Sequence, residues 1–124
     1  MNLSGSIEFC FHELTPESAV AEMPVHPGLL NPSGFVHAGA ILWLAVHAAT
    51  TLSAQGRGAG REAAAGIPVA VNLNANFTGN QKDGIIRAVS GYVRRGKRVS
   101  VVKTTVTGDQ GRLLAEITTN HMTL

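Results

Sequence analysis

The sequence is poor in cysteine and in charge. Its one cysteine, Cys10, excludes an intrachain disulfide and any zinc site made of several thiolates. Because Cys10 lies in an alternating apolar stretch, we expect a free thiol buried in the core. Charged residues make up 15% of the chain, and ten Lys and Arg against eight Asp and Glu leave a formal net charge of +2. A nucleic-acid-binding protein needs a stronger basic surface, so we expect no nucleic-acid partner.

Long apolar segments are also missing. No run approaches the roughly 20 apolar residues that cross a bilayer, and no basic and apolar leader opens the chain. The sequence therefore predicts a cytoplasmic protein with no membrane partner. Its 124 residues suit one domain, residues 1–124, and 44% hydrophobic residues argue against disorder. The low charge also favours an oligomer whose subunits cover part of one another's surface.

The first part of the chain predicts two strands, a loop and a helix. Alternation over residues 6–12, and more weakly over 18–23, indicates the strands. Residues 24–36 hold three prolines and two glycines, which excludes a regular element and indicates a long loop. Residues 37–54 carry no charge and are long enough for a helix, which must be buried on nearly all sides.

The second part predicts four strands. Residues 55–66 indicate an exposed connection, and residues 67–77 alternate strictly. The apolar face of that strand, which we expect to pack, comprises Ile67, Val69, Val71, Leu73, Ala75 and Phe77. A hairpin joins β-branched runs at 84–94 and 97–107, and a last strand ends near Thr123. One apolar helix beside a long antiparallel meander predicts an α+β fold in which the sheet curls around the helix, with an unrelated small α+β domain as the alternative.

Two motifs resemble a known family. The segment NPSGFVHAGA at residues 31–40 resembles the N-P-x-G-x-x-H-G-G-A segment of hotdog-fold acyl-coenzyme A thioesterases of the phenylacetate-degradation type, which are like 4-hydroxybenzoyl-coenzyme A thioesterase. The strand VNLNANF at residues 71–77 is similar to that family's V-D-L-N-x-x-[FY] strand. The closing hairpins, around residues 95–97 and 111–113, also match in order. This resemblance implies the hotdog fold, an antiparallel sheet wrapped around one long central helix.

The resemblance also implies a reaction and a set of partners. Members of the family hydrolyse an acyl-coenzyme A thioester as dimers or tetramers with active sites at subunit interfaces. Coenzyme A is then part of the substrate, and no separate cofactor is expected. The family polarises the thioester carbonyl with a backbone N–H after the histidine, which implies Ala38 and Gly39 here. A helix start suits this task because its free N–H groups and its dipole stabilise an oxyanion.

Four polar residues are further candidates. Asn31 matches a side chain that holds water or substrate, although an Asn-Pro pair also starts turns. His37 matches a histidine that more often shapes the loop than transfers protons. Thr50 matches a hydroxyl that positions water in one branch of the family, with helix packing as the alternative. His47 is a possible substitute base, against the alternative of a buried histidine bonded to the core or an interface.

The family's catalytic carboxylate is missing. It lies nine residues after the histidine, where this chain has Val46, which neither attacks a carbonyl nor activates water. Ala70 replaces a Ser or Thr that often assists from the strand after the helix, and we expect it to contact the substrate together with Val46 and Asn72. Glu13 and Glu62 could substitute only if loops folded over the site.

Coenzyme A also requires cations for its phosphates. Arg94, Arg95, Lys97 and Arg98 surround one hairpin tip and could supply them, although a solvated turn explains them equally well. The five histidines show no metal-ligand spacing, so no metal is expected.

The sequence thus leaves several functions open. The first is an acyl-coenzyme A thioesterase with an atypical site. The main alternative is a non-catalytic acyl-coenzyme A-binding protein, and a hotdog dehydratase or a purely structural oligomer are weaker ones.

Overall fold

The computed structural model describes residues 2–55 and 68–123, and it confirms the predicted order of elements. One helix, α1, follows two strands and precedes four. A short 3-10 turn, η1, comes before the helix, and a second, η2, lies between the last two strands. The elements are β1 (Cys10–Leu14), β2 (Ser18–Pro24), η1 (Pro27–Leu29), α1 (Ala38–Gln55), β3 (Pro68–Phe77), β4 (Ile85–Arg95), β5 (Val99–Thr107), η2 (Asp109–Gly111) and β6 (Leu113–Thr123).

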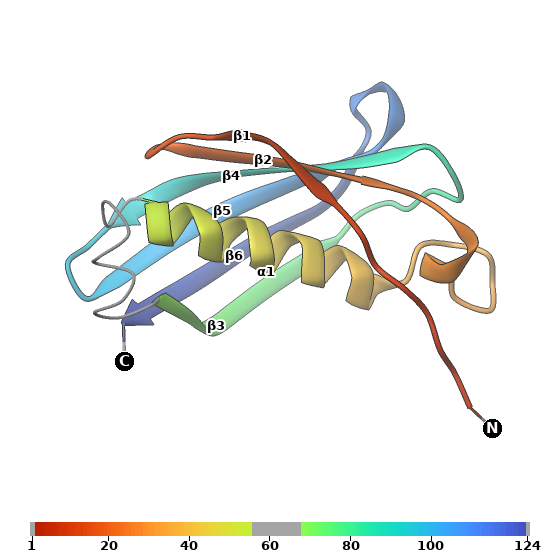
Figure 1. The fold of residues 1–124 in the computed structure, drawn as a ribbon, viewed down its shortest axis with the longest axis horizontal. Helices are drawn as coiled ribbons and strands as arrows, with labels where there is room; N and C mark the ends of the chain where they lie inside the picture. Colours follow the sequence, from red (N-terminus) through yellow and green to blue (C-terminus); the bar gives the residue numbers. More distant parts are fainter. Residues whose placement is uncertain (1, 56–67, 124) are drawn as a thin grey trace.

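The six strands form one antiparallel sheet that curves around α1 (Figure 1). Their order is β1-β2-β4-β5-β6-β3, so β1 and β3 are the two edges. The helix packs across the inner face, where Leu44, Ala45 and Ala48 are fully buried. Alanines let the helix lie close to the sheet, because their side chains occupy little of the space between the two layers. The hotdog fold predicted from the sequence is therefore confirmed.

The first strand starts later than the alternation predicted. Residues 6–9 belong to no strand, and the chain there crosses to η1, where Ser6 N–H donates to the Gly28 carbonyl at 3.2 Å. Cys10 is exposed, so the expectation of a buried thiol is wrong. The neighbouring Phe9 and Phe11 turn inward and are half-buried, which points the residue between them outward.

A β-bulge changes the faces of β3. The pairing with β6 slips between Ala70 and Asn72, so alternation shifts by one residue there. Val69 lies opposite Met122, on the face turned away from α1, whereas Leu73 lies opposite the buried Thr119, on the helix side. The single packed apolar face predicted for this strand is therefore wrong.

Much of β3 is also uncovered. Val71, Leu73 and Phe77 are 47%, 45% and 45% exposed, because the strand lies at an edge that α1 covers only in part. Ile67 and residues 56–66 of the predicted connection lie outside the described residues. Among the described helices, none has the length and hydrophobicity required to span a membrane.

Candidate functional site

The loop before α1 folds back on itself and fixes the place where the helix begins. Leu30 and Val36 form an isolated antiparallel bridge, and Asn31 N–H donates to the Phe35 carbonyl at 2.8 Å. Gly34 adopts a φ of 86°, in the left-handed region that favours glycine. The chain then returns to η1, because the N–H of His37 donates to the Leu29 carbonyl at 2.8 Å.

Asn31 holds this loop through its side chain. Its Oδ1 accepts hydrogen bonds from the N–H groups of Ser33, at 2.9 Å, and Phe35, at 3.2 Å. Such a pattern is that of an Asx turn, in which the side chain takes the place of a backbone carbonyl. The turn role of Asn31 is therefore confirmed. The side-chain NH2 group of Asn31 remains to bind a substrate or water, and this binding role stays a prediction.

The first N–H groups of α1 are used unequally. The side chain of His37 caps the helix, because its Nδ1 accepts from Gly39 N–H at 3.1 Å, while Ala40 N–H donates to the His37 carbonyl at 2.9 Å. Within the described part of the chain, no acceptor contacts Ala38 N–H. Of the two donors expected from the resemblance, Ala38 is thus available and Gly39 is already bonded. His37 has the loop-shaping role predicted for it.

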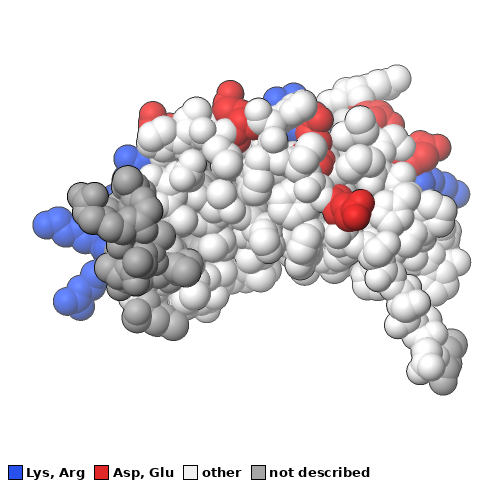
Figure 2. Space-filling model, viewed as in Figure 1, with Lys and Arg blue, Asp and Glu red and all other residues white. Residues whose placement is uncertain are grey.

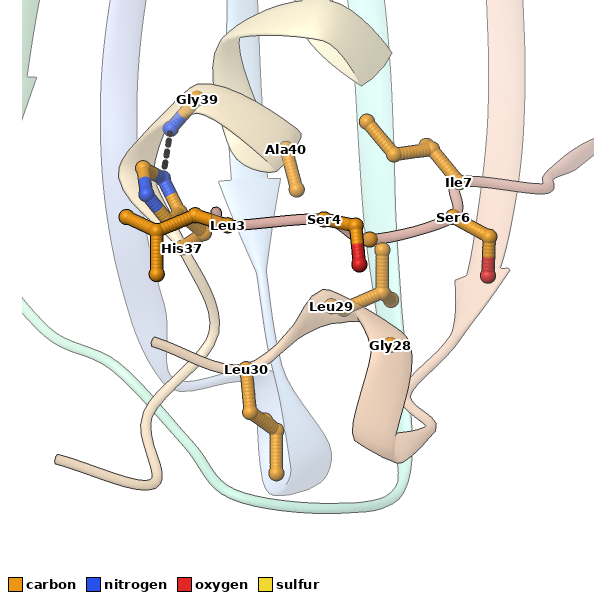
Figure 3. Close-up of a pocket in the computed structure, with 11 residues that line it drawn as sticks. Leu3, Ser4, Ser6, Ile7, Gly28, Leu29, Leu30, His37, Gly39 and Ala40 are labelled. Atoms are coloured by element: carbon orange, nitrogen blue, oxygen red, sulfur yellow. Dashed lines mark hydrogen bonds between the residues drawn. The ribbon is translucent and has the colours of Figure 1, made fainter. Parts of the chain in front are cut away.

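A cavity of about 350 Å³ lies beside this helix start (Figure 3). Three segments far apart in the sequence form its walls. They are the N-terminal residues 3–7, residues 28–30 at η1, and the helix start with His37, Gly39 and Ala40. No Asp, Glu, Lys or Arg is among the described lining residues, and most of them are Gly, Ala, Leu or Ile.

A side chain that the sequence did not single out clamps the same loop. Asn80 Nδ2 donates to the Val36 carbonyl at 3.0 Å, and Val36 N–H donates to the Gln81 carbonyl at 3.2 Å. Both backbone groups of the residue before His37 are therefore held by the turn between β3 and β4. No motif could have revealed this contact, because the two segments meet only in the folded chain.

The middle of α1 carries Val46, Thr50 and His47. Val46 and Thr50 are half-buried and one turn apart, as predicted. His47 is exposed, and its ring is tilted against that of Trp43 and edge-to-face with that of Phe9, at centroid distances of 4.8 and 5.5 Å. The expected burial in the core is therefore wrong, and burial at a subunit interface stays a prediction. His47 turns about 100° away from Val46 around the helix. The structure therefore does not bring this imidazole to the position of the missing carboxylate.

A buried polar pair lies on the inner face of the sheet. His121 is 1% exposed, and its Nε2 lies 2.7 Å from the hydroxyl of Thr119. Its Nδ1 has no hydrogen-bond partner among the described residues. Burial lowers the pKa of His121, because a charged imidazole would lose its hydration there. Ala70 lies directly opposite this histidine, whereas Asn72 is paired with Asn120 on the outer face, away from α1.

The basic hairpin lies far from the cavity within one chain. The β4–β5 turn is at the end of the molecule where α1 finishes, and the cavity is where α1 begins (Figure 1). The 18 residues of α1 span about 27 Å. Arg95 also has partners of its own, because it donates to the Pro16 carbonyl and its guanidinium lies 4.6 Å from the Tyr92 ring centroid. Arg94, Lys97 and Arg98 are exposed.

Carboxylates are scarce around this site. No Asp or Glu lines the cavity or occurs in α1. Glu13 is exposed on β1, and Glu62 lies outside the described residues. Most charged side chains lie at the margins of the face that carries α1, although an acidic patch is visible within its right half (Figure 2). The described site therefore offers a backbone donor, an apolar cavity and the imidazole of His37, whose Nδ1 is already bonded to Gly39 N–H, with no carboxylate beside them.

Comparisons with known proteins agree with this geometry. No protein-family model matches the chain. It is 30% identical over 110 residues to a Mycobacterium tuberculosis protein named "Putative esterase Rv1847", a match that covers 85% of this chain and 74% of that protein. The solved structure of the mycobacterial protein superposes with a TM-score of 0.85, at 27% identity, over 94% and 90% of the two chains.

Two further proteins are similar. The Bacillus subtilis protein named "Putative esterase ComA2" is 30% identical over 102 residues, which covers 82% of this chain and 78% of that one. A hypothetical thioesterase from Streptococcus pneumoniae TIGR4, solved with coenzyme A, has a TM-score of 0.83 at 16% identity. That match covers 94% of this chain and 86% of the pneumococcal one, and at this identity it shows a shared fold.

Proposed function

Because this chain belongs to the hotdog-fold thioesterase superfamily, we propose that it slowly hydrolyses a small or aromatic acyl-coenzyme A thioester at the start of α1. The observation that carries the proposal is the N–H of Ala38, which has no acceptor within the described residues. A helix start with one unused donor, next to an apolar cavity, suits an uncharged carbonyl that becomes an oxyanion.

The reaction needs little from the protein beyond this donor and a water molecule. The water oxygen attacks the thioester carbon, and the carbonyl oxygen gains negative charge opposite Ala38 N–H. The C–S bond then breaks, coenzyme A leaves as a thiolate, and the protons of water end on the thiol and on the released acid or the solvent. A thiolate is a good leaving group because the corresponding thiol has a pKa of about 8.5, so no general acid is required.

Activation of the water is the weak step. Val46 stands where the family has a carboxylate, and the imidazole of His47 turns elsewhere. Thr50 is the remaining polar side chain beside Val46, and a hydroxyl alone is a poor base. We therefore expect turnover well below that of a site with a carboxylate, by about 10²- to 10⁴-fold, which is what general base catalysis usually contributes.

The absence of a carboxylate at position 46 also favours a second candidate, a non-catalytic acyl-coenzyme A-binding protein. A site without a base keeps its oxyanion donor and its cavity and still binds the ligand. Coenzyme A as the ligand is supported by the pneumococcal thioesterase with which this chain shares its fold. The basic hairpin lies at the end of the molecule opposite the cavity. Phosphate contacts from Arg94, Lys97 or Arg98 would therefore have to come from another subunit. A dimer or tetramer would allow such contacts.

The test is thiol release from acetyl-, hexanoyl- and benzoyl-coenzyme A, measured together with ligand binding. The protein as it stands is compared with Val46→Asp and with Val46→Asn, which has the same shape but no negative charge. Slow turnover that rises at least tenfold in Val46→Asp, and not in Val46→Asn, supports the thioesterase proposal.

Two other results decide between the candidates. Binding without any turnover in the unchanged protein, with activity only in Val46→Asp, shows the non-catalytic binder instead. Failure to bind any of the three esters overturns both candidates.

A further inference from the structure

The cavity at the start of α1 has an unusual wall, made by residues 3–7 ahead of the first strand. We call these residues the N-terminal strap. They cross in front of the helix start and of η1, as Figure 3 shows. The shape of the cavity therefore depends partly on a segment that carries no family motif.

The strap is held in place by close backbone packing. Ser6 N–H donates to the Gly28 carbonyl at 3.2 Å. At Gly5, a Cβ atom would lie 2.5 Å from the same carbonyl oxygen, which is closer than real Cβ contacts occur. Only glycine therefore lets the strap approach η1 so closely. The far end is anchored as well, because Ile7 and Phe9 pack against the main core.

The free end of the strap presents an apolar side chain that nothing in the described chain covers. Leu3 lines the cavity, yet it is 78% exposed. Ile7 and Leu29 provide apolar surface deeper along the same walls. Binding is favoured when a hydrocarbon chain covers a leucine at the mouth of an apolar cavity, because apolar surface is then removed from water.

From these contacts we propose that the strap forms the acyl-binding wall and selects neutral apolar acyl groups of short to medium length, with Leu3 as a specificity-determining residue. The proposal rests on the proposed function, because it places the thioester carbonyl at Ala38. A cavity of about 350 Å³ is at the small end of ligand-binding sites, which suits an acyl group rather than a whole coenzyme. No Lys or Arg is among the described lining residues, which disfavours acyl groups that end in a carboxylate.

Equilibrium binding of coenzyme A and of acetyl-, hexanoyl- and succinyl-coenzyme A tests this. Hexanoyl-coenzyme A should bind more tightly than coenzyme A, and succinyl-coenzyme A should not. Leu3→Ala should weaken the binding of hexanoyl-coenzyme A by about fivefold, a loss expected for partial burial of a leucine. It should leave the affinity for coenzyme A unchanged. Leu3 is mostly exposed, so the variant should fold normally.

A second variant tests the strap as a whole. Gly5→Ala forces the strap away from Gly28 and should also reduce the preference for the hexanoyl ester. The control is Gly91→Ala, because nothing lies within 4 Å of a Cβ placed there. It should bind all four ligands as the unchanged protein does.

The outcomes separate this inference from the proposed function. Chain-dependent binding that responds to Leu3→Ala, without any thiol release, upholds the acyl wall and rejects hydrolysis. Thiol release with the same acyl preference in Leu3→Ala and Gly5→Ala rejects the acyl wall and leaves hydrolysis standing. Equal affinity for succinyl- and hexanoyl-coenzyme A, or equal weakening of coenzyme A itself, also overturns the inference.

Discussion

At the scale of single residues, the start of α1 depends on how three consecutive N–H groups are used. Ala40 bonds to the backbone of His37, Gly39 bonds to the His37 side chain, and Ala38 has no acceptor among the described residues. A histidine cap therefore reduces the available donors to one. This arrangement was only partly predictable, because the sequence shows which residues begin the helix and not which way the imidazole turns.

Ala38→Pro removes this donor with little structural change. Proline is well tolerated at the first position of a helix, where its missing N–H had no helical partner. We expect thiol release to fall by about 10²- to 10³-fold, the usual cost of one oxyanion donor. Ala38→Gly keeps the N–H and should retain the rate. Equal rates in the two variants would show that the carbonyl is polarised elsewhere.

His121 should make stability depend on pH. Burial lowers its pKa in the folded protein below the ordinary value of 6.5, so the unfolded chain binds the proton more readily. Its contribution is complete above about pH 6.5 and is lost as the pH falls through the lowered folded pKa. We expect the melting temperature to drop by a few degrees between pH 7.5 and 5.5. His121→Leu cannot titrate there and should show a smaller drop; an unchanged drop would assign the effect to other groups.

At the scale of elements, the helix was easier to predict than the strands at the two edges. The uncharged run at 37–54 predicted α1 to within one residue, because its length and composition suit only a buried helix. The bulge in β3 was not predictable, because it arises from pairing with β6 and leaves no mark in the alternation. The N-terminal strap was missed for a similar reason, since its contacts join Gly5 and Ser6 to Gly28 across the loop.

The aromatic cluster that anchors the start of the chain to α1 should contribute to stability. Phe9 packs edge-on against Phe11 and Trp43, with ring centroids 5.4 and 5.0 Å apart. We expect Phe9→Ala to lower the free energy of unfolding by about 2 kcal/mol, less than for a fully buried ring, in urea denaturation. Val93→Ala, at a strand position that is 62% exposed, should change it little. A loss below about 0.5 kcal/mol in Phe9→Ala would mean that the cluster does not anchor the segment.

At the scale of the whole molecule, the β3 edge is a surface that favours association. Its outer backbone groups have no strand partner among the described residues, and Val71, Leu73 and Phe77 are each about half exposed. An uncovered, ten-residue apolar edge strand readily pairs with another chain. The oligomer expected from the sequence thus has a candidate interface, which supports the proposed dimer or tetramer.

Leu73→Arg should weaken that association. A buried, unpaired charge at the edge disfavours strand pairing between subunits, so the dissociation constant of the dimer should rise at least tenfold. Light scattering after size exclusion should then show a smaller species. Val93→Arg places the same charge on β4, an inner strand, and should leave the oligomer intact. If Val93→Arg dissociates the protein and Leu73→Arg does not, association uses the face of the sheet.

The aromatic contact between the N-terminal residues and α1 also provides an optical probe. Trp43 is the chain's one tryptophan, it is 39% exposed, and Phe9 covers part of its indole. Any movement that lifts Phe9 away would bring more water to the ring and shift its fluorescence emission to the red. A change in this contact on ligand binding would therefore be measurable by stopped-flow fluorescence without an added dye.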